Sequence, residues 1–381
     1  MRRLAAVSSV FATTAVLAFG ATAPASAYDV DPTFFGGTYL GQAADAEAMR
    51  PWQGAGFRTL FAAQDGTIFY GYGNYDKNSG SKSGLGTNVS YFDASDGLFK
   101  QALTSMPGEQ IDTFRSFGGK VFVPNIDPTS GTVAIATNVN GTWSYRNNGM
   151  EHIFDVMQGL DANDILISGS ANIGGVPTAL VKRSRDGGAT WIEVYRWQDA
   201  PADRDGYERV YWMSRIGGNV YWRADVSTRG AQAPMTAFAL STGRLTKLGD
   251  TKLGTGWTGS NGRQLYVGEA IYEADRVVSA NNLIYLVEQG SVYWFDGAKT
   301  GVVTKTTTGY PYGADRITVD PVTNTVYVLD QGGISVVTGK TKALIKPLQA
   351  DYNMNTSNEF AVYNGVAYLG GDDSKLYSLP L

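Results

Sequence analysis

The sequence predicts an all-β protein built from repeated four-stranded antiparallel sheets. Three observations support this prediction. Outside its N-terminal segment the chain shows little helical periodicity, whereas 47 of its 381 residues are glycine and 12% are aromatic. Short apolar runs, each led by a turn of Gly, Asn or Asp, recur at intervals of 41 to 64 residues. Further short strands flank each run, and this spacing suits one four-stranded blade of a β-propeller per run.

Seven sets of strands can be aligned along the chain. The apolar runs form the second strand of each set, at residues 68–70, 121–123, 165–167, 220–222, 284–286, 326–328 and 367–369. A shorter strand precedes each run and opens on or near a polar residue, at 57–60, 112–114, 152–154, 209–211, 276–278, 316–318 and 359–361. A third strand and an outer hairpin follow. These sets favour seven blades, with the first strand of each lying innermost.

One segment leaves six or eight blades open as alternatives. Residues 265–267 also resemble a second strand, yet they lie only 19 positions before Ile284. We therefore expect residues 250–272 to form an insertion or a distorted outer strand.

The two ends of the chain are expected to meet. The last set stops after its third strand, residues 375–379, and an apolar segment at 34–40 has no assigned partner. Pairing of these segments would complete the last blade with strands from both ends. It would also remove the exposed sheet edges that an open ring leaves.

The N-terminus has the features of a secretion signal. Arg2 and Arg3 precede an apolar stretch over residues 4–19, and Ala25-Ser26-Ala27 fits a signal-peptidase site. We predict that residues 1–27 are a signal peptide and that residues 28–381 form a single propeller domain. A membrane anchor is the less favoured reading, because the run is short and interrupted by Ser and Thr. The predicted location is extracellular, periplasmic or cell-wall associated.

Composition excludes several classes of function. The absence of cysteine excludes disulfides, thiol catalysis and Cys-ligated metals, and a single histidine excludes a multi-histidine metal site. The net charge is −4 and no basic cluster occurs, which argues against a nucleic-acid partner. We expect a monomer with no cofactor, no bound metal and no membrane insertion.

Residues 184–191 carry the most specific motif in the chain. They read S-R-D-G-G-A-T-W, in the pattern S-x-D-x-G-x-T-W. This motif resembles the Asp-box of sialidases and other BNR-type β-propellers, which is set by Ser184, Asp186, Gly188, Thr190 and Trp191. The resemblance implies a structural role: Ser184 and Asp186 hold a hairpin together through hydrogen bonds, and Trp191 packs between blades. It supports the fold and assigns no activity.

The later blades resemble YVTN-type and NHL-type propellers, most clearly at residues 320–328, D-P-V-T-N-T-V-Y-V. The chain does not resemble a classical sialidase, because Arg58 is followed by Thr-Leu rather than Ile-Pro. In addition, no spacing singles out an arginine triad or a Tyr–Glu pair. Propellers of this kind include both enzymes and binding proteins, so the resemblance does not decide the function.

Candidate ligand-binding residues open the predicted inner strands, where a propeller brings side chains together at one mouth of its central channel. These residues are Arg58, Asp112, His152, Arg209, Arg276, Arg316 and Glu359. Guanidinium and carboxylate groups converging there could bind an anionic or polyhydroxylated ligand. The alternative is that they pair between blades and hold the ring together. Loss of ligand binding with an intact fold in an Arg276→Ala/Arg316→Ala variant would favour the first reading, and unfolding the second.

The first functional hypothesis is a secreted propeller that binds an extracellular ligand, a carbohydrate or cell-surface polymer, without catalysis. One alternative is a glycoside hydrolase or polysaccharide lyase that uses rim carboxylates and His152 as acid and base. Another is a protein-interaction scaffold. A serine hydrolase is disfavoured because the sequence has no G-x-S-x-G elbow.

Overall fold

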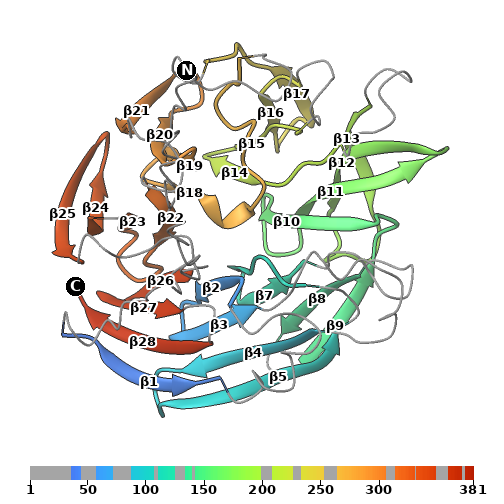
Figure 1. Cartoon of the computed structure of the whole chain (residues 1–381). Coiled ribbons are helices and arrows are strands. Elements are labelled where there is room, and N and C mark those ends of the chain that lie inside the picture. The colour runs from blue at the N-terminus through green and yellow to red at the C-terminus, as the bar shows by residue number, and fades with distance from the viewer. Residues whose placement is uncertain are drawn as a thin grey trace, which may run out of the picture.

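Seven four-stranded antiparallel sheets make up the computed structural model of the chain. The structure describes residues 36–43, 57–71, 87–106, 110–124, 134–139, 142–198, 208–225, 233–252, 264–305, 314–330, 332–348, 359–370 and 374–381. Figure 1 shows the sheets arranged around a central opening, with the first strand of each sheet lying nearest that opening. The fold is a seven-bladed β-propeller.

The first four blades follow the chain in order. Blade 1 comprises β2 (Thr59–Ala62), β3 (Thr67–Gly71), β4 (Thr87–Asp93) and β5 (Leu98–Met106). Blade 2 comprises β6 (Arg115–Phe117), β7 (Lys120–Val123), β8 (Ala134–Val139) and β9 (Thr142–Asn147). Blade 3 comprises β10 (His152–Gln158), β11 (Ile165–Ile173), β12 (Val176–Ser184) and β13 (Ile192–Trp197). Blade 4 comprises β14 (Met213–Ile216), β15 (Asn219–Trp222), β16 (Thr236–Ala239) and β17 (Arg244–Lys247).

The last three blades complete the ring. A short 3₁₀ helix, η4 (Ala274–Arg276), leads into blade 5. That blade comprises β18 (Val277–Ala280), β19 (Leu283–Glu288), β20 (Ser291–Phe295) and β21 (Thr300–Thr304). Blade 6 comprises β22 (Ala314–Val319), β23 (Val326–Asp330), β24 (Gly333–Thr338) and β25 (Thr341–Pro347). Blade 7 comprises β26 (Glu359–Tyr363), β27 (Val366–Gly370), β28 (Lys375–Pro380) and β1 (Thr38–Gln42).

Blade 7 takes strands from both ends of the chain. The outermost strand β1 runs antiparallel to β28, with Thr38 opposite Ser378 and Tyr39 opposite Tyr377. The Tyr39 and Tyr377 rings lie 5.3 Å apart between centroids. Figure 1 shows β1 in blue beside β28 in red. The pairing expected from the sequence is therefore present, although β1 begins at Thr38, and residues 34 and 35 of the expected segment lie outside the described residues.

Two inner strands begin later than the sequence indicates. β6 begins at Arg115 rather than at Asp112, and β14 begins at Met213 rather than at Arg209. The residues before each strand are buried but do not join the strand ladder. Arg209 instead forms an isolated bridge with Asp225, and the Gln110 amide donates to the Asp112 carboxylate at 2.6 Å. Before β6 a side-chain contact thus takes the place of sheet pairing, whereas before β14 the backbone pairing is only interrupted, because Arg209 and Asp225 exchange two backbone hydrogen bonds.

The segment that complicated the blade count is an insertion between blades 4 and 5, in those parts that the structure describes. Lys252 bridges Tyr266, and the Val267 amide donates to the Thr251 carbonyl at 2.9 Å. Val267 and Ile271 are buried against Trp212. Because residues 265–267 pack beneath a neighbouring blade rather than pair as a second strand, the number of blades stays at seven.

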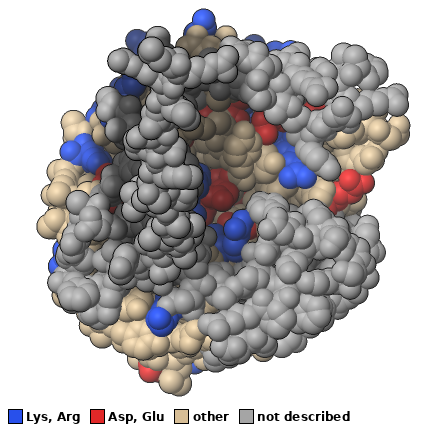
Figure 2. Space-filling model, viewed as in Figure 1, with Lys and Arg blue, Asp and Glu red and all other residues tan. Residues whose placement is uncertain are grey.

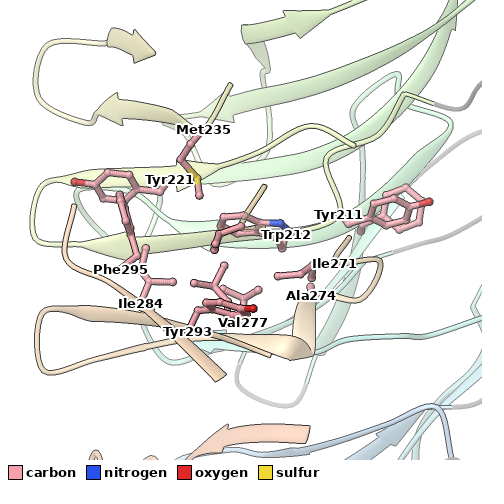
Figure 3. Packing of buried hydrophobic residues seen from close by; sticks show 13 residues of the cluster. Tyr211, Trp212, Tyr221, Met235, Ile271, Ala274, Val277, Ile284, Tyr293 and Phe295 are labelled. Carbon is pink, nitrogen blue, oxygen red and sulfur yellow. The ribbon is translucent and has the colours of Figure 1, made fainter. Parts of the chain in front are cut away.

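The hydrophobic core consists of layers between neighbouring blades. Figure 3 shows the layer between blades 4 and 5, where Trp212 lies among side chains from both sheets. The Trp212 indole donates to the Gly268 carbonyl at 3.0 Å. Trp212 and Trp222 are almost fully buried, so both belong to the core. Full burial of a large apolar side chain stabilises a fold by about 1.5–3 kcal/mol. Among the described residues, no helix is long and apolar enough to cross a membrane.

Candidate ligand-binding site at the channel mouth

Charged side chains gather where the inner strands begin. Figure 2 shows acidic and basic groups in the hollow near the middle of the ring. We use the name rim cluster for one connected group of these residues. Its members are Arg58, Asp112, Glu273, Asp275, Arg276, Arg316 and Glu359.

Ion pairs between blades hold the rim cluster in place. Arg316 of blade 6 makes a bidentate contact with Glu359 of blade 7, with N–O distances of 3.0 and 2.6 Å. The same guanidinium lies 3.5 Å from Glu273, which also accepts from Arg276 at 2.8 Å. Bidentate geometry fixes a guanidinium more firmly than a single contact does. The rim is therefore preorganised on the inner strands and on the turn before β18.

A fourth ion pair joins blades 1 and 2. The Arg58 Nε atom lies 3.7 Å from Asp112 Oδ1, and the Arg58 side chain is 26% exposed. This pair is looser than the Arg316–Glu359 pair and faces solvent more openly. Arg58 is therefore better placed than Arg316 to exchange its partner for a ligand.

The rim cluster carries four carboxyl groups against three guanidinium groups, so one carboxyl is not balanced. Burial raises the pKa of Asp275 to about 7, and the carboxylates of Glu273 and Asp112 add to the rise against the opposing charges of Arg316 and Arg276. Burial alone would raise the pKa of Glu273, but Arg316 and Arg276 outweigh it and lower that pKa to about 2. Burial also raises the pKa of Glu359, to about 8, so Asp275 and Glu359 are the two carboxyl groups of the rim cluster that burial drives toward protonation near neutral pH.

Beneath the rim lies a small cavity of about 110 Å³, whose lining combines apolar side chains with a few polar ones. Asp275 and Arg316 line it together with Thr113. Asp275 Oδ1 and Thr113 Oγ1 are buried there, and neither has a hydrogen-bond partner within the described part of the chain. Because buried polar atoms are costly to leave unpaired, these oxygens are the natural contacts for a polar group entering from the mouth.

Arg115 and Asp155 form the rigid support below this cavity. The Arg115 Nε atom lies 2.8 Å from Asp155 Oδ1, and its Nη2 atom donates to the Ala274 carbonyl at 2.9 Å. Asp155 is fully buried and also accepts from the Met213 amide at 2.8 Å. These contacts tie blades 2, 3, 4 and 5 together across the channel. Sequence reasoning did not nominate either residue, because their partners are distant along the chain.

Aromatic side chains form a second group beside the rim cluster, which we call the aromatic corner. The Phe154 and Tyr211 rings lie 4.6 Å apart, and Tyr211 meets Tyr272 edge-on at 5.5 Å. The Arg209 guanidinium lies 5.2 Å from the Phe154 centroid, over its ring, and donates to the Tyr211 hydroxyl at 3.1 Å. His152 stacks on Phe154 at 6.0 Å. Tyr272 is 53% exposed, so its ring is open to a ligand.

The seven residues nominated from the sequence fall into these two groups. Five of them belong to the rim cluster, namely Arg58, Asp112, Arg276, Arg316 and Glu359, whereas His152 and Arg209 belong to the aromatic corner. Glu273 and Tyr272 were missed. They precede the expected strand at 276–278 and lie on the turn that places them at the mouth. The run Tyr-Glu-Ala-Asp-Arg just before a buried strand was the available signal.

Residues 184–191 form the turn between β12 and β13, on the outer half of blade 3. Asp186 accepts hydrogen bonds from the Ser184 hydroxyl at 2.7 Å and from the amide and hydroxyl of Thr190 at 2.9 and 2.6 Å. The Gly188 amide donates to the Ser184 hydroxyl at 2.7 Å. Trp191 packs on the apolar layer between blades 2 and 3. The motif therefore shapes the outer part of the blade and does not contribute to the channel.

Within the described ranges, no group of three or more His, Cys, Asp or Glu side chains is arranged to hold a metal ion.

Comparison with known proteins supports the fold alone. No protein-family model matches the chain, and no curated protein matches it in sequence. In structure it is similar to a chain in the crystal structure of a mitotic checkpoint complex, with a TM-score of 0.54 and 11% identity. The match covers 97% of this chain and 99% of that chain. At this identity the likeness carries no activity or partner across, and it agrees with the seven four-stranded sheets: the chain is a β-propeller.

Proposed function

We propose that this protein is an exported, non-catalytic binding propeller whose ligand sits at the channel mouth formed by the rim cluster and the aromatic corner. The ligand is polyhydroxylated, a carbohydrate or a cell-surface polymer. One observation carries the proposal: the open ring of Tyr272 lies beside Tyr211 and next in sequence to Glu273 of the preorganised charged network. An aromatic face beside fixed hydrogen-bonding groups suits the alternating apolar and hydroxyl surfaces of a sugar ring.

The experiment is a glycan array combined with a polysaccharide-degradation screen on the secreted protein. Tyr272→Ala and Arg276→Ala should each weaken binding by about tenfold or more while the fold stays intact, since both side chains are partly exposed. Tyr39→Ala on the outer strand β1 is the matched control, because Tyr39 is a tyrosine of similar exposure, 48%, far from the mouth. Binding that survives both rim variants would refute the proposed site.

Arg316 is a poorer probe of binding than the sequence indicated. Its side chain is 7% exposed and its partner Glu359 is 2% exposed. Removing one partner of a buried ion pair typically costs about 3–5 kcal/mol, because the other charge is left without compensation. Arg316→Ala is therefore expected to unfold more easily, and its loss of binding would not identify a ligand contact.

A catalytic role is the second candidate, and one observation favours it. Glu273 and Asp275 are close carboxyl groups whose pKa values are about 2 and about 7. A pair separated in this way can supply one ionised and one protonated carboxyl at neutral pH, as glycoside hydrolysis requires. Cleavage of a polysaccharide that is abolished in Asp275→Asn would establish the enzyme. Binding without cleavage would leave the first proposal standing.

Export rests on residues 1–27, which precede the described residues. The proposal expects the protein in the culture medium or cell envelope with Tyr28 as its first residue. Mass spectrometry of the intact secreted protein measures this directly, and a chain that retains Met1 in the cytoplasm would contradict it.

A protein-interaction scaffold is the remaining alternative. The similarly folded chain comes from a multiprotein complex, but at 11% identity that likeness concerns the fold. A stable partner recovered with the wild-type protein and lost with Tyr272→Ala would move the proposal to this class.

A further inference from the structure

A second cavity lies among the inner strands of blades 2 to 5. It is larger than the cavity that Asp275 lines. Its volume is about 520 Å³, within the range of pockets that bind small molecules. The whole of β6, the end of β10, the first three residues of β14 and the first three residues of β18 line it, together with Gly217. Sequence reasoning placed ligands only where the inner strands begin, so this cavity belongs to neither group described above.

The walls of this cavity are largely apolar. Phe117, Met157, Met213 and three valines are among the apolar lining residues, and the polar ones are three serines, Gln158 and two arginines. No acidic residue lines the cavity. The lining therefore suits a mainly hydrocarbon molecule with a single polar end.

Two arginines line the cavity, and only one of them is neutralised. Arg115 is paired with Asp155 at 2.8 Å. Arg215 donates to the Gly217 carbonyl at 2.7 Å and to the Gly159 carbonyl at 2.5 Å. These carbonyl oxygens fix the guanidinium without cancelling its charge, and among the described residues no carboxylate forms an ion pair with it. The cavity thus carries one positive charge that is not balanced by its own wall.

From this arrangement we propose that the cavity binds a small amphiphilic monocarboxylate. The carboxylate pairs with Arg215, and the hydrocarbon body lies against Phe117, Met157 and Met213. A single negative charge matches the single unbalanced guanidinium, and arginine is suited to planar carboxylates. A dianion such as a phosphate monoester would leave a net negative charge among apolar walls, which is unfavourable. This inference does not depend on the ligand proposed for the channel mouth.

The test uses 4-phenylbutanoate as probe and its neutral counterpart, 4-phenylbutan-1-ol, with affinities measured by titration calorimetry on the full mature protein. The acid should bind at least tenfold more tightly than the alcohol. Arg215→Gln should remove that difference by weakening the acid alone. Ser279→Trp, which fills the cavity from its wall, should abolish binding of both. Arg276→Ala at the channel mouth should change neither affinity, which separates this site from the one proposed above.

Three outcomes would overturn the inference. They are the absence of saturable binding by either probe, equal binding of acid and alcohol by the wild-type protein, and binding that survives Ser279→Trp. Arg215 also joins blades 3 and 4, so circular dichroism must show that Arg215→Gln is folded. If it is not, Ser279→Trp still decides the location, and the comparison of acid with alcohol in the wild-type protein still decides the charge preference.

Discussion

At the scale of single residues, some charged side chains at the channel mouth form structural ion pairs, whereas others have atoms that form no hydrogen bond with any described residue. Arg316 and Glu359 are almost completely buried and satisfy each other, so they belong to the structural joint between blades 6 and 7. Asp275 differs from Glu359 in its hydrogen bonding, although burial raises the pKa of both groups, that of Glu359 to about 8. Asp275 lines the cavity of about 110 Å³ beneath the rim cluster, and one of its oxygens has no hydrogen-bond partner in the described part of the chain. Burial raises its pKa to about 7. A group of this kind is tolerated because it is protonated, or because a ligand meets it.

Asp275 makes stability depend on pH. The pKa of the folded state, about 7, lies above the ordinary value of 3.8, so the folded protein binds more protons between pH 4 and 7. The contribution of Asp275 to the free energy of unfolding is therefore fully present below pH 4 and is lost as the pH rises through 7. Asp275→Asn cannot titrate. Relative to this variant, the wild-type protein should lose at most about 4 kcal/mol in free energy of unfolding between pH 4 and 8.

Urea unfolding of both proteins at several pH values measures this difference. Parallel stability curves for the two proteins would show that Asp275 has an ordinary pKa and would remove the charge-balance argument for the rim cluster.

At the scale of single elements, the positions of the second strands were easier to predict than the residues at which the first strands begin. All seven second strands lie where the apolar runs indicated, because their side chains are buried on both sides and need no polar residue. β6 begins late because Asp112 contacts the Gln110 side chain instead of joining the ladder, and β14 begins late because its pairing with the β15 side is interrupted between the Arg209–Asp225 bridge and Met213. Residues 265–267 of the insertion before blade 5 have the apolar pattern of a strand. They are apolar because they pack against a neighbouring blade, not because they pair with another strand.

The hairpin at residues 184–191 is predicted to depend on Asp186. Three donors converge on this carboxylate, including the Thr190 amide. Asp186→Ala should therefore speed hydrogen exchange at the Thr190 amide by about tenfold or more, because the local opening that exposes it becomes easier. The turn between β20 and β21, where Asp296 caps the amides of Ala298 and Lys299, is the internal control and should exchange at the same rate. Unchanged exchange at Thr190 would show that Asp186 does not hold the hairpin.

At the scale of the whole molecule, the ring is closed by β1 from the N-terminal end and β28 from the C-terminal end. Each blade buries its faces against two neighbours, so an unpaired edge in blade 7 would weaken both adjoining layers. The channel and both cavities described above exist only in the closed ring. Binding at either cavity therefore depends on strands that contribute no residue to it.

A disulfide across this closure should stabilise the protein. Thr38 and Ser378 are direct antiparallel partners, a separation that a disulfide can span. Because the native chain has no cysteine, the Thr38→Cys/Ser378→Cys variant can form only this intramolecular bond. Oxidation should raise its free energy of unfolding by up to about 5 kcal/mol, since the bond closes a very long loop.

Thermal unfolding with and without reductant measures this effect, and the Thr38→Cys single variant is the control. If the oxidised variant shows no gain over the reduced one, the two strands are not paired in solution.

The sequence by itself determined the all-β class and the pairing of the two ends, and it favoured seven blades, whereas the structure settled that number by showing residues 265–267 outside the second strands. Periodic apolar runs and turn residues encode strands locally, and repetition of the pattern leaves few arrangements that bury every run. It also indicated which polar residues gather at the mouth. Only the tertiary structure decided which of them pair with each other, that Asp275 has a buried oxygen without a hydrogen-bond partner in the described part of the chain, and that Arg215 lines a largely apolar cavity. Those properties depend on distances between side chains from different blades, and spacing along the chain does not specify such distances.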